Sequence, residues 1–393
     1  MTQTAPSSRW SGRAALLVGH CAGMADLAAL PLWIGALVGS YRFSPQQAGG
    51  LVTLFLGGAV VASIACASLF HRVRGRAVAT CGFAAASLFF FILSSTSGFN
   101  AMALLHALAG VAVGCAASAT HGTIGRSVHP HRLFALAGLA LGVFALAFLG
   151  VVPVLIERFG GSAIFSALSA VMGMAALTAL AVFPPADVPA PALVAGDRAM
   201  PAAAWFVVLG ISIMSLNQSM MFSFVERIGI DRGFGTPLVH GVLIALGLVN
   251  LIPAPLAAVL ETRVNARTVV LAGPVVQAII ILVLTQIEGV APYAVAVAFC
   301  VFPMIFTHTF AFGMLARLDP SGRATAATAA MVMIGAASGP VIAGTLVQSF
   351  GYASLGISAI VVATLSVLGF SRVREPKPRA VPVVSTVPQA LVQ

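Results

Sequence analysis

Long blocks of apolar residues alternate along the chain with short segments that hold most of its charged residues. An α-helix of about 20 apolar residues crosses the roughly 30 Å hydrocarbon core of a bilayer. Twelve blocks reach that length, over residues 13–38, 45–70, 76–97, 99–125, 132–156, 162–183, 202–226, 236–260, 267–287, 291–316, 322–348 and 351–371. The pattern therefore predicts an all-α integral membrane protein with 12 transmembrane helices.

One polar segment is longer than the others and divides the blocks into two sets of six. Residues 184–201, PPADVPAPALVAGDRAMP, are rich in Pro and Ala and have few large apolar side chains. Such a segment is typical of an irregular linker. We therefore predict an N-terminal six-helix bundle over 1–183, a cytoplasmic linker, a C-terminal six-helix bundle over 202–371, and a disordered cytoplasmic tail over the Pro-rich residues 372–393.

The two sets of six blocks also repeat each other in sequence. The segment after the second block, LFHRVRGRAVATCG (69–82), matches the segment after the eighth, LETRVNARTVVLAG (260–273), at six of 14 positions with an offset of 191. Phe159-Gly160 and Phe350-Gly351 are related by the same offset. The repeat predicts two pseudo-symmetric bundles, an arrangement that places a substrate site at the membrane midplane between them.

Composition and charge narrow the class further. Apolar residues make up 60% of the chain, charged residues 8%, and the mean hydropathy is +1.05, which excludes a soluble globular protein. The net charge of +10 comes from arginines in short loops, so it predicts membrane orientation and no nucleic-acid partner. Of 20 Lys and Arg residues, only Arg42, Arg158, Arg227 and Arg232 fall on the side opposite the termini, which places both termini in the cytoplasm.

Several chemistries have no sequence support. The five cysteines lie within apolar blocks without CxxC spacing, so neither a disulfide framework nor a metal site is expected. The chain has no GxxxxGK[ST] loop for nucleotide hydrolysis. The first apolar block is too long for a signal peptide and is expected to be retained. We therefore expect no enzyme activity, no cofactor and no bound metal.

One carboxylate interrupts the first block near its middle. Asp26 lies inside the block, whereas the other nine acidic residues fall at or outside block ends. An ionised Asp at the bilayer midplane is unfavourable by several kcal/mol unless water or a partner reaches it, and such groups commonly carry protons in transporters. Asp26 is therefore predicted to be a proton-coupling and substrate-binding residue. The alternative is a static polar residue that is hydrogen-bonded to a neighbouring Ser or His.

Other polar or aromatic residues within the blocks are candidates for the same cavity. His106 is a second candidate for proton coupling, because imidazole changes charge in the physiological pH range; a neutral, structural histidine is the alternative. Asn217 is the counterpart of Asp26 at the offset of 191. The amides of Asn217 and Gln218 can orient a polar substrate or simply join helices. The predicted cavity residues are Asp26, Trp33, His106, Asn217, Gln218 and His308.

Two sequence motifs resemble signatures of the major facilitator superfamily (MFS). The loop after the second block, SLFHRVRGRA, matches the family's GxLaDrxGrr at Gly75-Arg76, but Ser68 and Arg72 replace its first glycine and its aspartate. The fourth block contains HALAGVAVG, which matches RxxqGxgaG at both glycines, with His106 in place of the arginine. From this resemblance we expect the loop residues Arg72, Gly75 and Arg76 and the repeat-related Arg263 and Arg267 to take part in gating.

Glycine pairs spaced four residues apart predict close helix packing. The eleventh block contains GAASGPVIAG, which is similar to the family's antiporter signature gxxxGPxxGG, whereas the fifth block matches that signature poorly. The residues expected to pack helices are Gly110, Gly114, Gly138, Gly142, Gly335, Gly339 and Pro340.

The resemblance covers residues 13–374 and implies a monomeric secondary transporter of bacterial type in the inner (plasma) membrane, working by alternating access. One midplane acid and no midplane base favour proton-coupled efflux of a neutral or cationic amphipathic small molecule. Three alternatives remain open: a proton symporter that takes up an organic anion, an uncoupled facilitator, and a membrane sensor or assembly partner that transports nothing.

Overall fold

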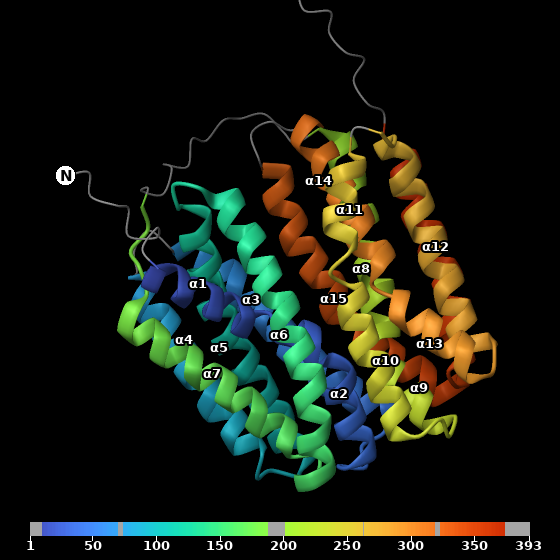
Figure 1. Ribbon diagram of the computed structural model, residues 1–393, viewed down its shortest axis with the longest axis horizontal. Helices are drawn as coiled ribbons and strands as arrows, with labels where there is room; N and C mark the ends of the chain where they lie inside the picture. The colour runs from blue at the N-terminus through green and yellow to red at the C-terminus, as the bar shows by residue number, and fades with distance from the viewer. Residues whose placement is uncertain (1–9, 70–73, 188–200, 262, 319–322, 374–393) are drawn as a thin grey trace, which may run out of the picture.

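Helices account for nearly all of the regular structure in the computed structural model, which describes residues 10–69, 74–187, 201–261, 263–318 and 323–373 (Figure 1). The N-terminal helices are α1 (Trp10–Gly23), α2 (Asp26–Gly39), α3 (Pro45–Leu69), α4 (Gly75–Leu93), α5 (Phe99–Gly125), α6 (Pro130–Phe159) and α7 (Ala163–Val182). The C-terminal helices are α8 (Ala202–Phe222), α9 (Val225–Asp231), α10 (Thr236–Val249), α11 (Pro253–Leu260), α12 (Ala266–Gln286), α13 (Val290–Phe299), α14 (Phe302–Leu318), α15 (Arg323–Phe350) and α16 (Ala353–Ser371). Arg72, most of the predicted linker and the predicted tail beyond 373 lie outside these residues.

The described residues contain 12 helical spans long and apolar enough to cross a membrane, which confirms the predicted number. Four spans consist of two consecutive helices: span 1 of α1 and α2, span 7 of α8 and α9, span 8 of α10 and α11, and span 10 of α13 and α14. The sequence predicts that span 7 ends at 226, but the structure continues it to Asp231. The printed bounds therefore place Glu226 and Asp231 inside span 7, and Glu157 inside span 5, which runs to Phe159.

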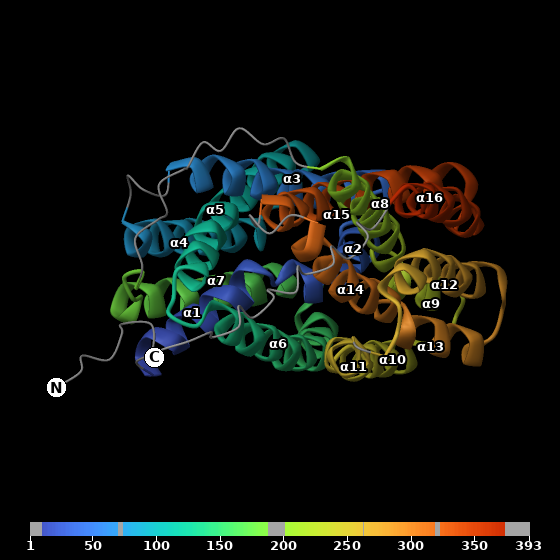
Figure 2. The ribbon, with the colours of Figure 1, turned by 90° about the horizontal axis from the view of Figure 1, so that it is seen from above.

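The spans form two six-helix halves, α1–α7 and α8–α16, which lie side by side in Figures 1 and 2. We call the end of the molecule at which α1 begins and α16 ends the proximal end, and the opposite end the distal end. The largest cluster of buried apolar side chains contains residues of both halves. In the N-terminal half it includes an aromatic cluster around Trp33, whose ring centroid lies 5.0 Å from that of Phe55 and 5.6 Å from that of Phe90.

Contacts between the halves extend from the middle of the spans to the distal end. In α3 and α15, a Cβ at Gly49 would lie 2.0 Å from the Pro340 carbonyl oxygen, and the Val341 N–H donates to Thr53 Oγ1 at 3.2 Å. Helix α2 also contacts α9, and α6 contacts α10. Among the described residues, none of the hydrogen bonds, ion pairs or close glycine contacts between the halves lies near the proximal end. The halves are therefore closed together distally.

Two arginines related by the repeat make equivalent contacts. Arg76, at the start of α4, donates to the Leu180 carbonyl at the end of α7. Arg267, at the start of α12, donates to the Val373 carbonyl beyond α16 at 2.5 Å and to that of Ser371 at 3.3 Å. Each arginine thus joins two helices of its own half. In this conformation neither bonds to the other half, as a gating contact would, and the Arg263 side chain is exposed to solvent.

Most of the predicted packing glycines lie where another helix approaches closely. A Cβ would lie 1.9 Å from the Phe55 carbonyl oxygen at Gly110 and 2.3 Å from the Ser212 carbonyl oxygen at Gly335. The same holds at Gly114 against Ala59, at Gly142 against Leu251 and at Gly339 against Ser219. The prediction for Gly138 is wrong: it is exposed, and a Cβ there meets no atom within 4 Å, because that side of α6 faces away from the other helices.

Pro340 interrupts the hydrogen bonding of α15 and a neighbouring helix compensates. Proline has no N–H to donate to the carbonyl four residues earlier, that of Ala336. Ser219 Oγ in α8 donates to this carbonyl at 2.7 Å. The Ala336 carbonyl thus has a donor within the C-terminal half, while the Pro340 carbonyl itself faces Gly49 of the other half.

Candidate functional site

The first span is interrupted near its middle, and Asp26 lies at the interruption. Helix α1 ends at Gly23 and α2 begins at Asp26, within a span that runs from Trp10 to Gly39. The carboxylate is bonded by its own backbone N–H, and among the described residues no other hydrogen bond or ion pair reaches it. The start of a helix carries partial positive charge, which favours a carboxylate there. Within the described ranges, no Ser or His side chain bonds the carboxylate, as a static polar residue would require.

Asp26 is partly buried and shares a helical face with residues of the N-terminal interior. By the 3.6-residue period, Leu30, Trp33 and Leu37 lie on its face of α2, and all three are buried. Leu27, the next residue, is 49% exposed, so the surface of the protein begins directly beside Asp26. Asp26 therefore lies at the edge of the N-terminal half, between its apolar interior and an accessible surface.

His106 is fully satisfied within the N-terminal half. Its Nδ1 lies 2.7 Å from the Met102 carbonyl oxygen and its Nε2 accepts from Trp33 Nε1 at 3.2 Å. This pattern fixes a neutral imidazole with the hydrogen on Nδ1, because Nε2 acts as an acceptor. Both His106 and Trp33 are fully buried. The structure thus gives His106 the contacts of a neutral, structural histidine, while substrate binding by Trp33 and His106 and proton coupling by His106 stay predictions.

Replacing His106 by Leu is expected to destabilise the protein without changing how its stability depends on pH. The substitution leaves the Trp33 N–H buried without an acceptor, which lowers the free energy of unfolding by about 1–3 kcal/mol. Thermal melting in detergent at pH 5.5 and pH 8 measures both properties, and we expect the same decrease at each pH. A decrease confined to one pH would instead support a titrating His106.

An amide cluster occupies the interior of the C-terminal half. Gln277 of α12 accepts from Asn217 Nδ2 at 3.4 Å, and its own amide nitrogen donates to Gln218 Oε1 at 3.0 Å. Asn217 and Gln277 are almost fully buried, whereas Gln218 is half-buried and its Nε2 has no described partner. Asn217 therefore joins helices within its half. Gln277 was not singled out from the sequence, although it is a lone amide in the middle of an apolar block.

Replacing Gln277 by Leu is expected to separate the packing role of this cluster from a binding role. Loss of its amide leaves groups of Asn217 and Gln218 unpaired, so the melting temperature falls, with a loss of about 1–3 kcal/mol in unfolding free energy. Gln286→Leu is the control at the exposed end of the same helix; its amide donates to the Ala353 carbonyl at 2.8 Å in a solvent-exposed contact, so we expect a smaller loss there. Equal melting temperatures for the two variants would contradict this assignment.

His308 in α14 differs from His106 because part of its ring is unsatisfied. Its Nε2 is buried and has no hydrogen-bond partner among the described residues, while its ring centroid lies 4.2 Å from that of Phe312. The hydroxyl of the preceding Thr307 is likewise buried and unpartnered, against Gly273. Unsatisfied buried polar atoms near the middle of a span are positions where a ligand or water can bond.

A histidine pair that the sequence did not predict lies on the proximal side of Asp26. His20 Nδ1 and His121 Nε2 are 2.9 Å apart, joining α1 to α5. For a hydrogen bond at this distance, one of the two ring nitrogens carries the hydrogen and donates it, and the other accepts it. Both histidines are visible in the sequence, but their blocks are distant along the chain and only the packing of span 1 against span 4 brings them together.

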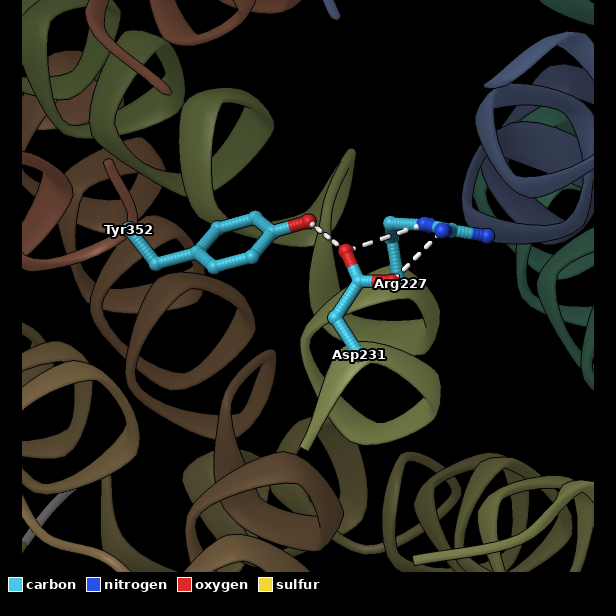
Figure 3. A network of polar contacts seen from close by, with 3 residues as sticks. All are labelled: Arg227, Asp231 and Tyr352. Atoms are coloured by element: carbon cyan, nitrogen blue, oxygen red, sulfur yellow. Dashed lines mark hydrogen bonds and ion pairs between the residues drawn. The ribbon is translucent and has the colours of Figure 1, made fainter. Parts of the chain in front are cut away.

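A second group of ionisable residues lies at the distal end. Asp231 Oδ2 accepts from Arg227 Nε at 3.0 Å and from the Tyr352 hydroxyl at 2.6 Å (Figure 3). Burial, together with the Asp231 carboxylate, raises the pKa of Tyr352 above its ordinary value, so the hydroxyl stays protonated and donates. Glu226 lies one residue before Arg227, with a side chain only 14% exposed. Asp26 is therefore not alone: the expectation that it is the single acid inside a span is wrong.

No group of three His, Cys, Asp or Glu side chains in the described part of the chain is arranged to hold a metal ion. Of the six predicted cavity residues, Gln218 and His308 each have a buried nitrogen without a hydrogen-bond partner among the described residues, and Asp26 has only its own backbone N–H as a partner there. The structure satisfies or buries Trp33, His106 and Asn217.

Comparison with solved structures places this fold among membrane transporters. A mutant of the nucleoside transporter NupG is similar with a TM-score of 0.70 and 11% sequence identity, over 91% of this chain and 98% of that one. A bacterial homologue of the human lysosomal transporter Spinster, in an inward-facing and occupied conformation, is similar with a TM-score of 0.69 and 14% identity, over 91% and 94% of the chains. At these identities the likeness shows the fold alone.

The sequence itself decides the family. No curated protein matches the chain, but the model of one family does, over residues 15–321, which is well over half of its length. Members of that family move small molecules across membranes, so the match points to a multi-pass membrane transporter and not to an enzyme. The chain belongs to the Major Facilitator Superfamily.

Proposed function

We propose that this protein is a proton-coupled secondary transporter that exports a neutral or cationic amphipathic small molecule by alternating access, with Asp26 as the proton-binding group. The observation that carries the proposal is the Asp26 carboxylate at the break in span 1, which among the described residues is bonded only by its own backbone N–H. An unpaired carboxylate in the middle of a membrane is stable only when it is protonated or hydrated. A group that must gain a proton whenever water is excluded links proton movement to the change of conformation.

The contacts between the halves support access to Asp26 from one side of the membrane at a time. If the positively charged loops face the cytoplasm, the proximal end is cytoplasmic and the distal end is extracellular. The halves are then closed together on the extracellular side and separate on the cytoplasmic side. We place their boundaries at 1–183 and 202–371, with a linker between them. The His20–His121 pair lies between Asp26 and the cytoplasm, where it can pass protons towards water.

The polar groups near the middle of the spans favour a substrate without a strong negative charge. Asp26, Gln218 and His308 offer one carboxylate, one amide and one imidazole. The described arginines of the spans all lie near span ends, so no fixed cation awaits an organic anion. An anion symporter would need protonated histidines, and His308 is the one that the structure leaves available.

A ligand screen by thermal shift on the purified full chain tests this proposal. Amphipathic cations, neutral amphipathic compounds, nucleosides and organic anions are each added at pH 5.5 and pH 7.5. We expect stabilisation by a cationic or neutral amphipathic compound, stronger at the higher pH where Asp26 is ionised, since proton and substrate compete in an exporter. Stabilisation by an anion at low pH would support the symporter, and a pH-independent ligand would support the facilitator. A non-transporting sensor predicts no movement of the ligand in proteoliposomes.

A further inference from the structure

Three ionisable side chains meet where the two halves close at the distal end. His240 of α10 has its Nδ1 3.6 Å from Glu157 Oε1 of α6 and its Nε2 4.0 Å from Glu226 Oε1 of α9. We call Glu157, Glu226 and His240 the distal cluster. Glu157 belongs to the N-terminal half and the other two to the C-terminal half, so the imidazole lies between carboxylates on both sides of the contact.

The Glu226 carboxylate is itself pressed onto the N-terminal half. A Cβ at Gly35 of α2 would lie 1.6 Å from Glu226 Oε2, so the carboxylate occupies the space that a side chain would fill. Oε2 is buried and has no hydrogen-bond partner among the described residues. A buried, unsatisfied carboxylate oxygen is strongly unfavourable when it is ionised and much less so when it is protonated.

The neighbouring arginines direct their hydrogen bonds to groups other than this carboxylate. Arg227 is engaged by Asp231, through Nε at 3.0 Å and Nη2 at 2.5 Å, and Figure 3 shows it extending from α9 towards the N-terminal half. Arg232 donates to the carbonyls of Leu284, Thr285 and Ile287.

The other ionisable groups near the cluster also leave Glu226 without a partner. The Tyr293 hydroxyl of α13, near Cys300, donates to the Val225 carbonyl. Helix α2 presents Gly35 at this contact, and Arg158 next to Glu157 is exposed. Without an added proton, the cluster therefore holds two carboxylates and a neutral imidazole.

We propose that the distal cluster is a proton-binding site, separate from Asp26, whose proton holds the distal end closed. Both ring nitrogens of His240 can donate only when the ring is protonated, and the imidazolium then attracts Glu157 and Glu226 at once. A proton on Glu226 instead removes the buried charge at Gly35. Loss of the proton leaves like charges on the two halves, and their separation hydrates both carboxylates. The proton comes from and returns to the distal aqueous phase, so the cluster responds to pH on that side.

The test measures the distance between the halves at the distal end as a function of pH. Nitroxide spin labels are attached at Ser95→Cys and Glu288→Cys, exposed positions between α4 and α5 and between α12 and α13, after replacement of the five native cysteines. Pulsed electron–electron resonance on the purified full chain gives the distance distribution between pH 5 and pH 9. In the otherwise unaltered protein we expect one short distance at low pH and a growing longer component as pH rises.

Variants of the cluster are expected to shift this transition in opposite directions. Glu226→Gln is nearly isosteric and uncharged, so the short distance persists up to pH 9. His240→Gln removes the imidazolium, so the longer component appears at a pH lower by about one unit or more. Glu261→Gln, an exposed carboxylate at the proximal end of span 8, is the matched control and should follow the parent protein.

Two outcomes would overturn the inference: a distance distribution that does not change with pH in the parent protein, or a transition that Glu226→Gln leaves in place. The Asp26→Asn variant separates this site from the proposed function. We expect its distal transition to match that of the parent. A transition lost in Asp26→Asn and kept in Glu226→Gln would assign the pH response to Asp26 and reject the distal cluster, while the proposed function would stand.

Discussion

Substituting Asp26 by Asn is expected to abolish substrate accumulation driven by a pH gradient while leaving downhill exchange in place. Asn has almost the same shape as Asp but cannot bind and release a proton, so the two half-reactions are no longer linked. One proton exchanged for one substrate supports a concentration ratio of about tenfold for each pH unit of gradient. Proteoliposomes with an imposed gradient, loaded with the compound found in the thermal-shift screen, should show that ratio for the parent protein and a ratio of one for the variant.

Two further variants show whether the loss of accumulation in Asp26→Asn is specific to the loss of a titratable group at that position. Asp26→Glu keeps a titratable carboxylate and should retain part of the accumulation, and Glu288→Gln changes an exposed carboxylate in a distal loop and should behave as the parent. Accumulation that survives in Asp26→Asn would remove Asp26 from the coupling mechanism. No accumulation in the parent, with downhill movement present, would identify an uncoupled facilitator.

Replacing Gly49 by Val is expected to prevent distal closure and to lower transport at least tenfold. The added Cβ would lie 2.0 Å from the Pro340 carbonyl oxygen and 3.1 Å from the Val341 Cα, which are backbone atoms that cannot rotate away. Overpacking of this kind is unfavourable by about 1–3 kcal/mol, enough to change a conformational equilibrium roughly tenfold. The spin-label pair at Ser95 and Glu288 should report the longer distance at every pH.

The chain offers an unusually close control for this variant. Gly50 is the next residue of α3, and a Cβ there meets no atom within 4 Å, so Gly50→Val should keep both the short distance and transport. Gly344→Val, whose Cβ would lie 2.2 Å from the Pro45 carbonyl oxygen on the other side of the same contact, should reproduce the Gly49→Val result. If Gly49→Val and Gly50→Val gave the same distances, the contact between α3 and α15 would not control closure.

The sequence by itself determined the membrane class, the 12 spans and the relation between the halves. These features follow from block length and composition, which the bilayer imposes locally on each segment. The offset of 191 was readable because equivalent loops kept the same residues, and the structure gives Arg76 and Arg267 equivalent contacts at equivalent helix ends. Asp26 could also be singled out from the sequence, because a single charge within an apolar block is recognised without knowledge of its neighbours in space.

Only the tertiary structure decided which polar residues are satisfied. His106 and Asp26 look alike in the sequence, as lone polar groups in apolar blocks, yet Trp33 and Met102 complete the hydrogen bonds of the first and no described side chain completes those of the second. The sequence placed Glu226 at the end of a block, and the block pattern does not show that the helical span continues to Asp231. Partners supplied by other spans decide whether a polar atom packs, binds or titrates, and chain order does not encode that proximity.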